Sequence, residues 1–269
     1  MPLLHQSVAE VALAVVDVET TGLWAETGDR VCEVAVLRAE PGREPDVFSS
    51  LVNPGRPIEP AASNVNGLQD ADLTDAPEFA AIAGTLSALL QDAVLVAHNA
   101  AFDVGFLTAE YAIARLGPPS PPVIDTLDLA RQLFSFPRNN LDALAREFRV
   151  AAEGRHRAEG DVWTLYQVFG RMLEELRQRG DWSVADLLGA QSSQLSLASP
   201  SLDHLTEPIR AAVGSGCPVT ICYRDGEGLS TERVVRPLWA NANYLIGYCE
   251  LVRAQRTFRL SRIEDAWLS

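Results

Sequence analysis

Short β-branched runs dominate the beginning of the chain and predict three strands. The runs cover residues 11–18, 31–39 and 47–52, and turn residues around Gly22 and Gly42 separate them. Both connections are hairpin-like, so we expect the three strands to be antiparallel.

Beyond residue 77 the apolar spacing becomes mostly helical. One buried strand is predicted at residues 93–97, and helices are predicted at residues 78–90, 102–116, 141–148 and 162–179. Three antiparallel strands followed by helices on both sides of a buried strand indicate an α/β domain. We expect it to have a mixed sheet and flanking helices.

The last part of the chain returns to strand patterns after a serine-rich segment. Residues 191–200 are rich in Ser and poor in charge, which is typical of an exposed linker. After one short helix, strands are predicted at residues 219–223, 231–236, 244–249 and 257–260. We therefore divide the chain into an α/β domain (1–189), a linker (190–204) and a small all-β domain (205–269).

The charge is unevenly distributed between these parts. The formal net charge is −14, and residues 205–269 hold 8 Arg against 7 acidic residues, so the excess acid lies in residues 1–204. Acidic surface normally disfavours a nucleic-acid partner, but bound cations would reverse the charge locally. The chain contains no Lys, and every basic contact is therefore a guanidinium. A GC-rich coding sequence explains most of that bias.

Neither a membrane segment nor a cysteine-based site is predicted. No apolar run approaches the ~18 residues of a membrane span, and we expect a soluble, cytoplasmic protein without a membrane partner. The four cysteines lack CxxC spacing and histidine partners, so buried thiols are expected rather than zinc ligands or disulfides.

The first chemical signal is the pair Asp17 and Glu19, which interrupts an otherwise apolar strand. Side chains two residues apart on a strand point to the same face, so the two carboxylates converge. Carboxylates placed together repel unless a cation lies between them, and their oxygens suit Mg²⁺ or Mn²⁺. A solvated strand end is the plain alternative.

Two further acids lie at the beginnings of helices. Asp103 follows a buried strand, where it either caps its helix or faces the strand end that carries Asp17. Asp161 opens the long helix after residue 160, and His156 precedes it by five residues. A histidine at such a junction can accept a proton from water at neutral pH, although a lone histidine is more often simply a surface residue.

Together, and in this order, the three segments resemble the motifs of the DEDDh family of 3′→5′ exonucleases, which includes the epsilon proofreading subunit of bacterial DNA polymerase III, oligoribonuclease and RNase T. The motifs are Asp-x-Glu-Thr-Thr-Gly, His-Asn-Ala-x-Phe-Asp and His-x-Ala-x-x-Asp. The resemblance implies an RNase H-like fold in which Asp17, Glu19, Asp103 and Asp161 hold two Mg²⁺ or Mn²⁺ ions about 4 Å apart. It also implies that His156 deprotonates the attacking water.

The resemblance further implies contacts with the terminal nucleotide. The corresponding positions here are Thr20, Thr21, Leu23, Asn99 and Phe102. Ordinary turn and core packing is an equal alternative for them. One segment departs from the family: its His-Gly-Ile is Asn66-Gly67-Leu68 here, and Ala61 replaces a Glu of the polymerase subunit. These differences from the family affect the expected contacts with the terminal nucleotide but not the expected metal ligands.

The small domain resembles a WYL domain, a small SH3- or Sm-like β-barrel. The matching segments begin at Asn243 and Arg256, although Asn243 replaces the Trp of the motif. WYL domains often sense ligands or nucleic acids, which makes Tyr244 a candidate for base stacking and Arg259 and Arg262 candidates for phosphate contacts. The alternative is a docking barrel with Tyr244 in its core.

We therefore predict an enzyme that hydrolyses DNA from a free 3′ end, in DNA replication or repair. Two alternatives are the same chemistry on short RNA and a sensing regulator that only binds, which the complete set of ligands disfavours. Within the linker, the pentapeptide Gln194–Ala198 resembles the peptide with which bacterial proteins bind the β sliding clamp, except that Ala198 replaces the final aromatic. The clamp is thus a candidate partner, and a plain linker is the alternative.

Overall fold

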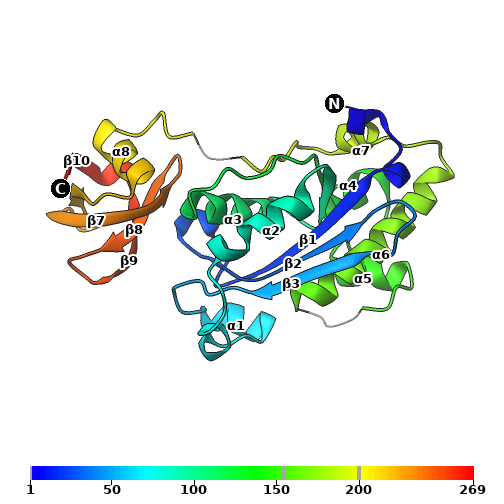
Figure 1. Ribbon diagram of the computed structural model, residues 1–269, viewed down its shortest axis with the longest axis horizontal. Coiled ribbons are helices and arrows are strands. Elements are labelled where there is room, and N and C mark those ends of the chain that lie inside the picture. Colours follow the sequence, from blue (N-terminus) through cyan, green and yellow to red (C-terminus); the bar gives the residue numbers. More distant parts are fainter. Residues whose placement is uncertain (1, 153–155, 199–200) are drawn as a thin grey trace.

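The computed structural model describes residues 2–152, 156–198 and 201–269, which form two separate β-sheets with helices packed on them (Figure 1). The strands of the first sheet are β1 (Ala12–Thr20), β2 (Val31–Ala39), β3 (Asp46–Leu51), β4 (Ala93–Ala97) and β5 (Val123–Asp125). Their order is β3-β2-β1-β4-β5. The first three strands pair antiparallel, as predicted, and β4 and β5 are added in parallel. The mixed sheet and the α/β class are confirmed.

Helices cover both faces of this sheet. They are α1 (Pro60–Asn66), α2 (Phe79–Leu90), α3 (Ala100–Ile113), α4 (Thr126–Leu133), α5 (Leu141–Glu147), α6 (Ala158–Arg177) and α7 (Val184–Ala190). Alternation along β1 assigns its side chains to the two faces. Ala14 and Val16 join the apolar cluster that contains α2 and α3, whereas Leu13 and Val15 join the cluster that contains α6. Asp17 therefore continues the face that α6 covers.

The sequence patterns missed several short elements. The strand β5 has three residues, and the helices α4 and α7 have eight and seven. Such segments span too few periods for a pattern to be distinct. Side-chain caps stabilise both helices: Asp125 accepts the backbone amide of Leu127 at the start of α4, and Ser183 accepts that of Asp186 in α7.

The second sheet is entirely antiparallel and has its own core. Its elements are α8 (Glu207–Ser215), β6 (Val219–Arg224), β7 (Ser230–Ala240), β8 (Tyr244–Cys249), β9 (Ala254–Arg259) and β10 (Ile263–Leu268), with the strand order β10-β6-β7-β8-β9. Ile209 of α8 packs with Val219, Val235 and Phe258 in one apolar cluster. The predicted all-β unit is confirmed, and β10 extends it beyond the strands that the sequence indicated.

Side chains of the small domain also contact the first domain. Trp239 and Ile246 are buried in the same cluster as α2 and α3. The loop between β1 and β2 contains the short helix η3 (Ala25–Thr27), whose backbone accepts hydrogen bonds from the other side of the junction. Asn241 donates to the Glu26 carbonyl at 3.1 Å, and Gln255 donates to the Gly28 carbonyl at 2.9 Å.

The serine-rich segment is more closely packed than an exposed linker. Leu197 is only 1% exposed and joins the cluster of α2 and α3, and Leu195 packs against that cluster. Gln194 donates to the Leu188 carbonyl at 2.6 Å. Residues 192–194, 196 and 198 are exposed, but Leu197 is buried, because alternate leucines give this segment an apolar face to bury. Within the described ranges, no helix is long and apolar enough to cross a membrane.

Candidate active site

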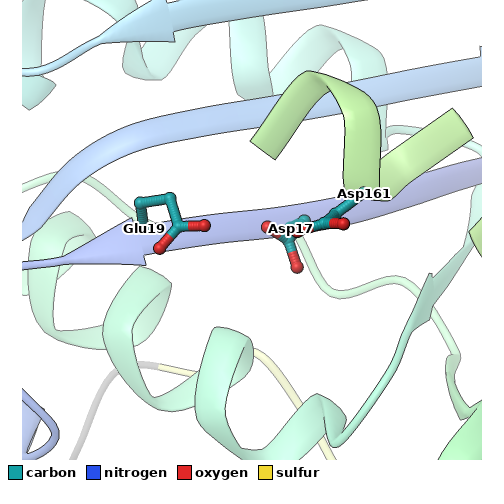
Figure 2. A group of neighbouring side chains, drawn as sticks. All are labelled: Asp17, Glu19 and Asp161. Atoms are coloured by element: carbon teal, nitrogen blue, oxygen red, sulfur yellow. The ribbon is translucent and has the colours of Figure 1, made fainter. Parts of the chain in front are cut away.

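Three carboxylates meet at the end of β1. Asp17 and Glu19 project from the strand toward Asp161, which α6 brings across the same face of the sheet (Figure 2). One oxygen of each carboxylate lies within 4.8 Å of the others. Burying apolar positions of β1 and α6 against each other therefore brings together acids that are more than 140 residues apart.

The carboxylates of this cluster repel one another. Burial, followed by the charges of Asp103 and Glu19, raises the pKa of Asp17 well above its ordinary value. Burial and the charges of Asp161 and Glu33 raise the pKa of Glu19 to about 7. A divalent cation would relieve this repulsion, and oxygen ligands suit Mg²⁺ or Mn²⁺. The residues present therefore fit a cation site.

Asp103 lies close to this cluster but outside the group of three. It is buried in the first turn of α3, and its Oδ1 accepts the backbone amide of Val18 at 3.1 Å. Its charge is the second cause of the raised pKa of Asp17, after burial. Burial likewise raises the pKa of Asp103 itself well above its ordinary value. The structure thus places the fourth predicted ligand beside β1, with one oxygen bonded to the strand.

His156 lies two residues before the first residue of α6 and is exposed. Its φ of 59° is left-handed, and its backbone amide donates to Asp161 Oδ2 at 3.2 Å. The structure therefore links the backbone of His156 to one member of the cluster. The role of its imidazole as a base stays a prediction.

The sequence analysis missed an ion pair between the buried Glu33 and the exposed Arg157, which adjoins the cluster. Glu33 on β2 pairs directly with Glu19 across the strands, and it is 2% exposed. Arg157 binds both oxygens of Glu33, with Nη2–Oε1 at 2.8 Å and Nε–Oε2 at 3.0 Å. The backbone amide of Ala158 donates to the same carboxylate at 3.2 Å. The signal in the sequence is an acid inside the apolar run 31–39.

The Thr-Thr-Gly turn after Glu19 is held by its own hydrogen bonds. Thr20 Oγ1 donates to the Gly22 carbonyl at 2.6 Å, and Thr21 Oγ1 accepts the Arg30 amide at 3.0 Å. Both threonines are buried. A Cβ at Gly22 would lie 2.4 Å from Oδ2 of Asp29, so only glycine fits there. Packing accounts for these threonines, and their nucleotide contacts stay a prediction.

The other predicted substrate residues differ in exposure. Leu23 is 67% exposed, and Trp24 beside it is 60% exposed. Asn99 is exposed with a φ of 67°, and Phe102 is half-buried, with its ring centroid 4.8 Å from that of Phe106. Leu23 and Asn99 are thus available to a ligand.

Asn66, where the sequence departs from the family motif, has a structural role. It is buried, and its Nδ2 donates to the Thr20 carbonyl at 3.3 Å. Its Oδ1 accepts the Leu68 amide at 3.0 Å. The side chain therefore ties α1 to the turn that follows Glu19.

The candidate residues of the small domain lie on different parts of it. The Arg259 guanidinium lies 5.9 Å from the centroid of the Tyr244 ring, and the two line a hollow of about 370 Å³. Arg262 is exposed in the short helix η5 (Leu260–Arg262) and does not line that hollow. Their contacts with nucleic acid stay predictions.

Comparisons with known proteins match each of the two domains to a family. Residues 14–169 match the RNase T exonuclease family, and residues 204–268 match the WYL domain family. A PolC-type DNA polymerase III of Bacillus cereus is 36% identical over 177 residues, which are 65% of this chain and 12% of that protein. A DNA polymerase III subunit epsilon-like protein of Rhodobacter capsulatus is 36% identical over 176 residues, which are 64% of this chain and 25% of that protein. The chain thus spans a quarter or less of these relatives.

Solved structures share the fold of the first domain. Exonuclease X in complex with 5′-overhanging duplex DNA has a TM-score of 0.52 at 24% identity, over 66% of this chain and 98% of that one. A 3′-exonuclease that recognises the 3′ end of a histone mRNA stem-loop has a TM-score of 0.54 at 16% identity, over 62% of this chain and 83% of that one. These likenesses confirm the RNase H-like architecture.

Proposed function

This chain belongs to the RNase T exonuclease family and carries a C-terminal WYL domain, and from that premise we propose that it hydrolyses DNA from the 3′ end to nucleoside 5′-monophosphates. The observation that carries the proposal is the convergence of Asp17, Glu19 and Asp161 within 4.8 Å. Three partly buried carboxylates, two of which (Asp17 and Glu19) have raised pKa values, are unfavourable without a cation, so their retention favours a catalytic use. The relatives that are DNA polymerase III proteins support DNA as substrate and a role in replication or repair.

The positions of the side chains support the roles proposed for them. Asp17, Glu19 and Asp161 would hold Mg²⁺ or Mn²⁺, with Asp103 as the fourth ligand through its second oxygen. Bound cations supply positive charge that stabilises the attacking and leaving oxygens. His156, on the loop that Asp161 holds by its backbone, would accept the proton of the attacking water.

The experiment is a cleavage assay on 5′-labelled single-stranded DNA, duplex DNA and RNA, with Mg²⁺, Mn²⁺ or EDTA. We expect a ladder of products shortened from the 3′ end on DNA, dependent on the cation. Equal or faster cleavage of short RNA would support the RNA alternative. Binding without cleavage would support the regulator.

Substitution of the cluster provides the matched control. Asp17→Asn and Asp161→Asn should abolish cleavage, because each removes a ligand charge while keeping the side-chain volume. Asp75→Asn changes an exposed acid outside the cluster and should leave cleavage unchanged. Cleavage by Asp17→Asn at the native rate would contradict the assignment.

A further inference from the structure

A groove of about 790 Å³ lies where the two domains meet. The first domain contributes Arg30 and the loop 53–57 to its walls, and the small domain contributes Tyr248 of β8 and the turn and strand 253–257. Neither domain forms this groove alone.

The groove is cationic in a protein that is otherwise acidic. Its lining contains four arginines and a single acidic residue, Glu78. Two of the arginines are fixed by carboxylates: Arg30 Nε lies 2.7 Å from Glu110, and Arg56 Nη1 lies 2.9 Å from Asp29. Such pairing fixes the wall of the groove and neutralises these two charges, so the net positive charge comes from the other two arginines.

The other two arginines are free of such pairing. Arg253 and Arg256 are exposed, and in the part of the chain that the structure describes they form no ion pair. Tyr248, which pairs with Gln255 across β8 and β9, is 38% exposed and lines the same groove. Unpaired guanidinium groups next to an exposed aromatic ring are the combination with which proteins bind single-stranded nucleic acid, through phosphates and stacked bases.

The wall of the groove is joined directly to the active site. The backbone amide of Thr21 donates to the Arg30 carbonyl at 2.8 Å, and that of Glu59 donates to the Thr21 carbonyl at 2.9 Å. Thr21 follows Glu19 by two residues. These backbone hydrogen bonds tie the wall of the groove to the turn that follows Glu19.

We propose that this junction groove binds the sugar–phosphate backbone of single-stranded nucleic acid upstream of the 3′ end, a role that rests on the exonuclease function proposed above. Arg253 and Arg256 contact phosphates, and Tyr248 stacks on a base. This site differs from the hollow between Tyr244 and Arg259, which shares no residue with it.

Binding in the absence of cleavage tests the groove. A labelled 20-nucleotide DNA strand is titrated with full-length protein in EDTA at several salt concentrations, and the same is done with RNA. The double variant Arg253→Glu/Arg256→Glu should bind on the order of tenfold more weakly or worse. Losing two phosphate contacts should also reduce the slope of log K against log salt by about 1.4, at ~0.7 per contact. Arg253→Lys/Arg256→Lys, which retains both charges, should keep most of the affinity.

Two other double variants serve as comparisons. Arg146→Glu/Arg177→Glu makes the same change in net charge outside the groove and should leave affinity and salt slope nearly unchanged. Arg259→Glu/Arg262→Glu tests the other face of the small domain. The proposal is overturned if either of these pairs weakens binding as much as the groove variant does, or if the groove variant binds as the native protein does.

The two proposals can fail separately. Cleavage of a labelled trinucleotide with Mg²⁺ depends on the carboxylate cluster alone, because a trinucleotide is too short to fill the groove. Native protein that binds the 20-nucleotide strand through the groove but cleaves neither substrate would refute the exonuclease function and not the groove. If the protein cleaves the trinucleotide but its affinity for the 20-nucleotide strand does not change when Arg253 and Arg256 are substituted, only the proposal for the groove is refuted.

Discussion

At the scale of single residues, charge balance dominates this site. Glu19 and Glu33 are direct cross-strand neighbours, a placement of like charges that is unfavourable. Arg157 neutralises Glu33 with a bidentate pair, so the charge left uncompensated belongs to Glu19 and the cluster around it. This arginine directly follows His156, so its ion pair anchors the loop that carries the proposed base. One ion pair thus adjoins both the proposed cation ligands and the loop of the proposed base.

His156→Gln should reduce the cleavage rate on the order of 10²–10⁴-fold, the usual contribution of a general base. Cation affinity should be retained, because the carboxylates remain. The measurement is single-turnover cleavage, with Mn²⁺ binding followed by calorimetry. His5→Gln, which changes a histidine on the short helix η1 (Pro2–His5), is the matched control. A variant with the native rate would show that another group accepts the proton.

Arg157→Gln should also slow cleavage, because the buried Glu33 then loses its partner and the loop of His156 loses its anchor. Arg157→Lys should recover part of the rate, since it keeps the charge without the bidentate geometry.

Stability of the cation-free protein should depend on pH in an unusual direction. The pKa of Glu19 is raised from 4.5 to about 7, so between these values the folded state binds more protons than the unfolded chain. The free energy of unfolding therefore falls as the pH rises through this interval. Thermal unfolding in EDTA should show Tm decreasing by several degrees from pH 5 to pH 8, at about 2–4 °C per kcal/mol.

Two comparisons isolate this effect. Glu19→Gln removes the titrating group and should flatten the profile, whereas Asp75→Asn should leave it as in the native protein. Added Mg²⁺ should raise Tm most at pH 8, where the carboxylates are charged. A native Tm that rises steadily from pH 5 to pH 8 in EDTA would contradict the repulsion described for this cluster.

At the scale of elements, short segments are held by contacts outside themselves. The η3 loop accepts hydrogen bonds from Asn241 and Gln255 of the small domain. Gly28, at the end of this loop, has a φ of 105°, and a Cβ there would lie 2.7 Å from Nε2 of Gln255. The left-handed conformation favours glycine, and a larger side chain would also displace Gln255 from its hydrogen bond. The segment 191–198 is likewise held by the burial of Leu197.

The packing of Leu197 affects the proposed clamp contact. In the folded protein, binding to the β sliding clamp requires Leu197 to leave the core, whereas a free peptide has no such cost. We therefore expect a peptide of residues 189–201 to bind the clamp more tightly than the full-length protein does, measured by competition against a known clamp ligand. The peptide variant Leu197→Ala should bind less tightly still. Equal affinity of peptide and protein would show that the segment is already exposed in solution.

At the scale of the whole molecule, the two domains share an apolar cluster. Trp239 and Ile246 are 6% and 0% exposed and belong to the cluster of the first domain rather than that of their own sheet. Two domains joined only by a flexible linker would not bury side chains against each other in this way. The contact holds η3, which lies on the loop after Glu19, and so connects the small domain to the candidate active site.

Deletion of residues 201–269 should therefore reduce stability as well as binding. The remaining domain would expose the apolar surface that Trp239 and Ile246 cover, and its Tm should fall by several degrees. Trinucleotide cleavage should persist at temperatures where the domain is folded, while affinity for a 20-nucleotide strand should fall. Identical Tm values for the two chains would show that the junction contributes little. The point variant Ile246→Ala, in the full chain, provides a milder test of the same contact.

The sequence by itself determined the long elements, the order of the two units and the acids of the candidate site. Val and Ala runs specify β1 and β2 locally, and Asp17 and Glu19 share a face because strand periodicity is exactly two. It did not determine which surfaces meet, since contacts such as Asp161 with β1, Arg157 with Glu33 and Trp239 with the first domain join residues far apart in the chain. These depend on packing helices and strands together, which local periodicity does not encode. Only the tertiary structure decided that Leu197 is buried and that arginines from two domains line one groove.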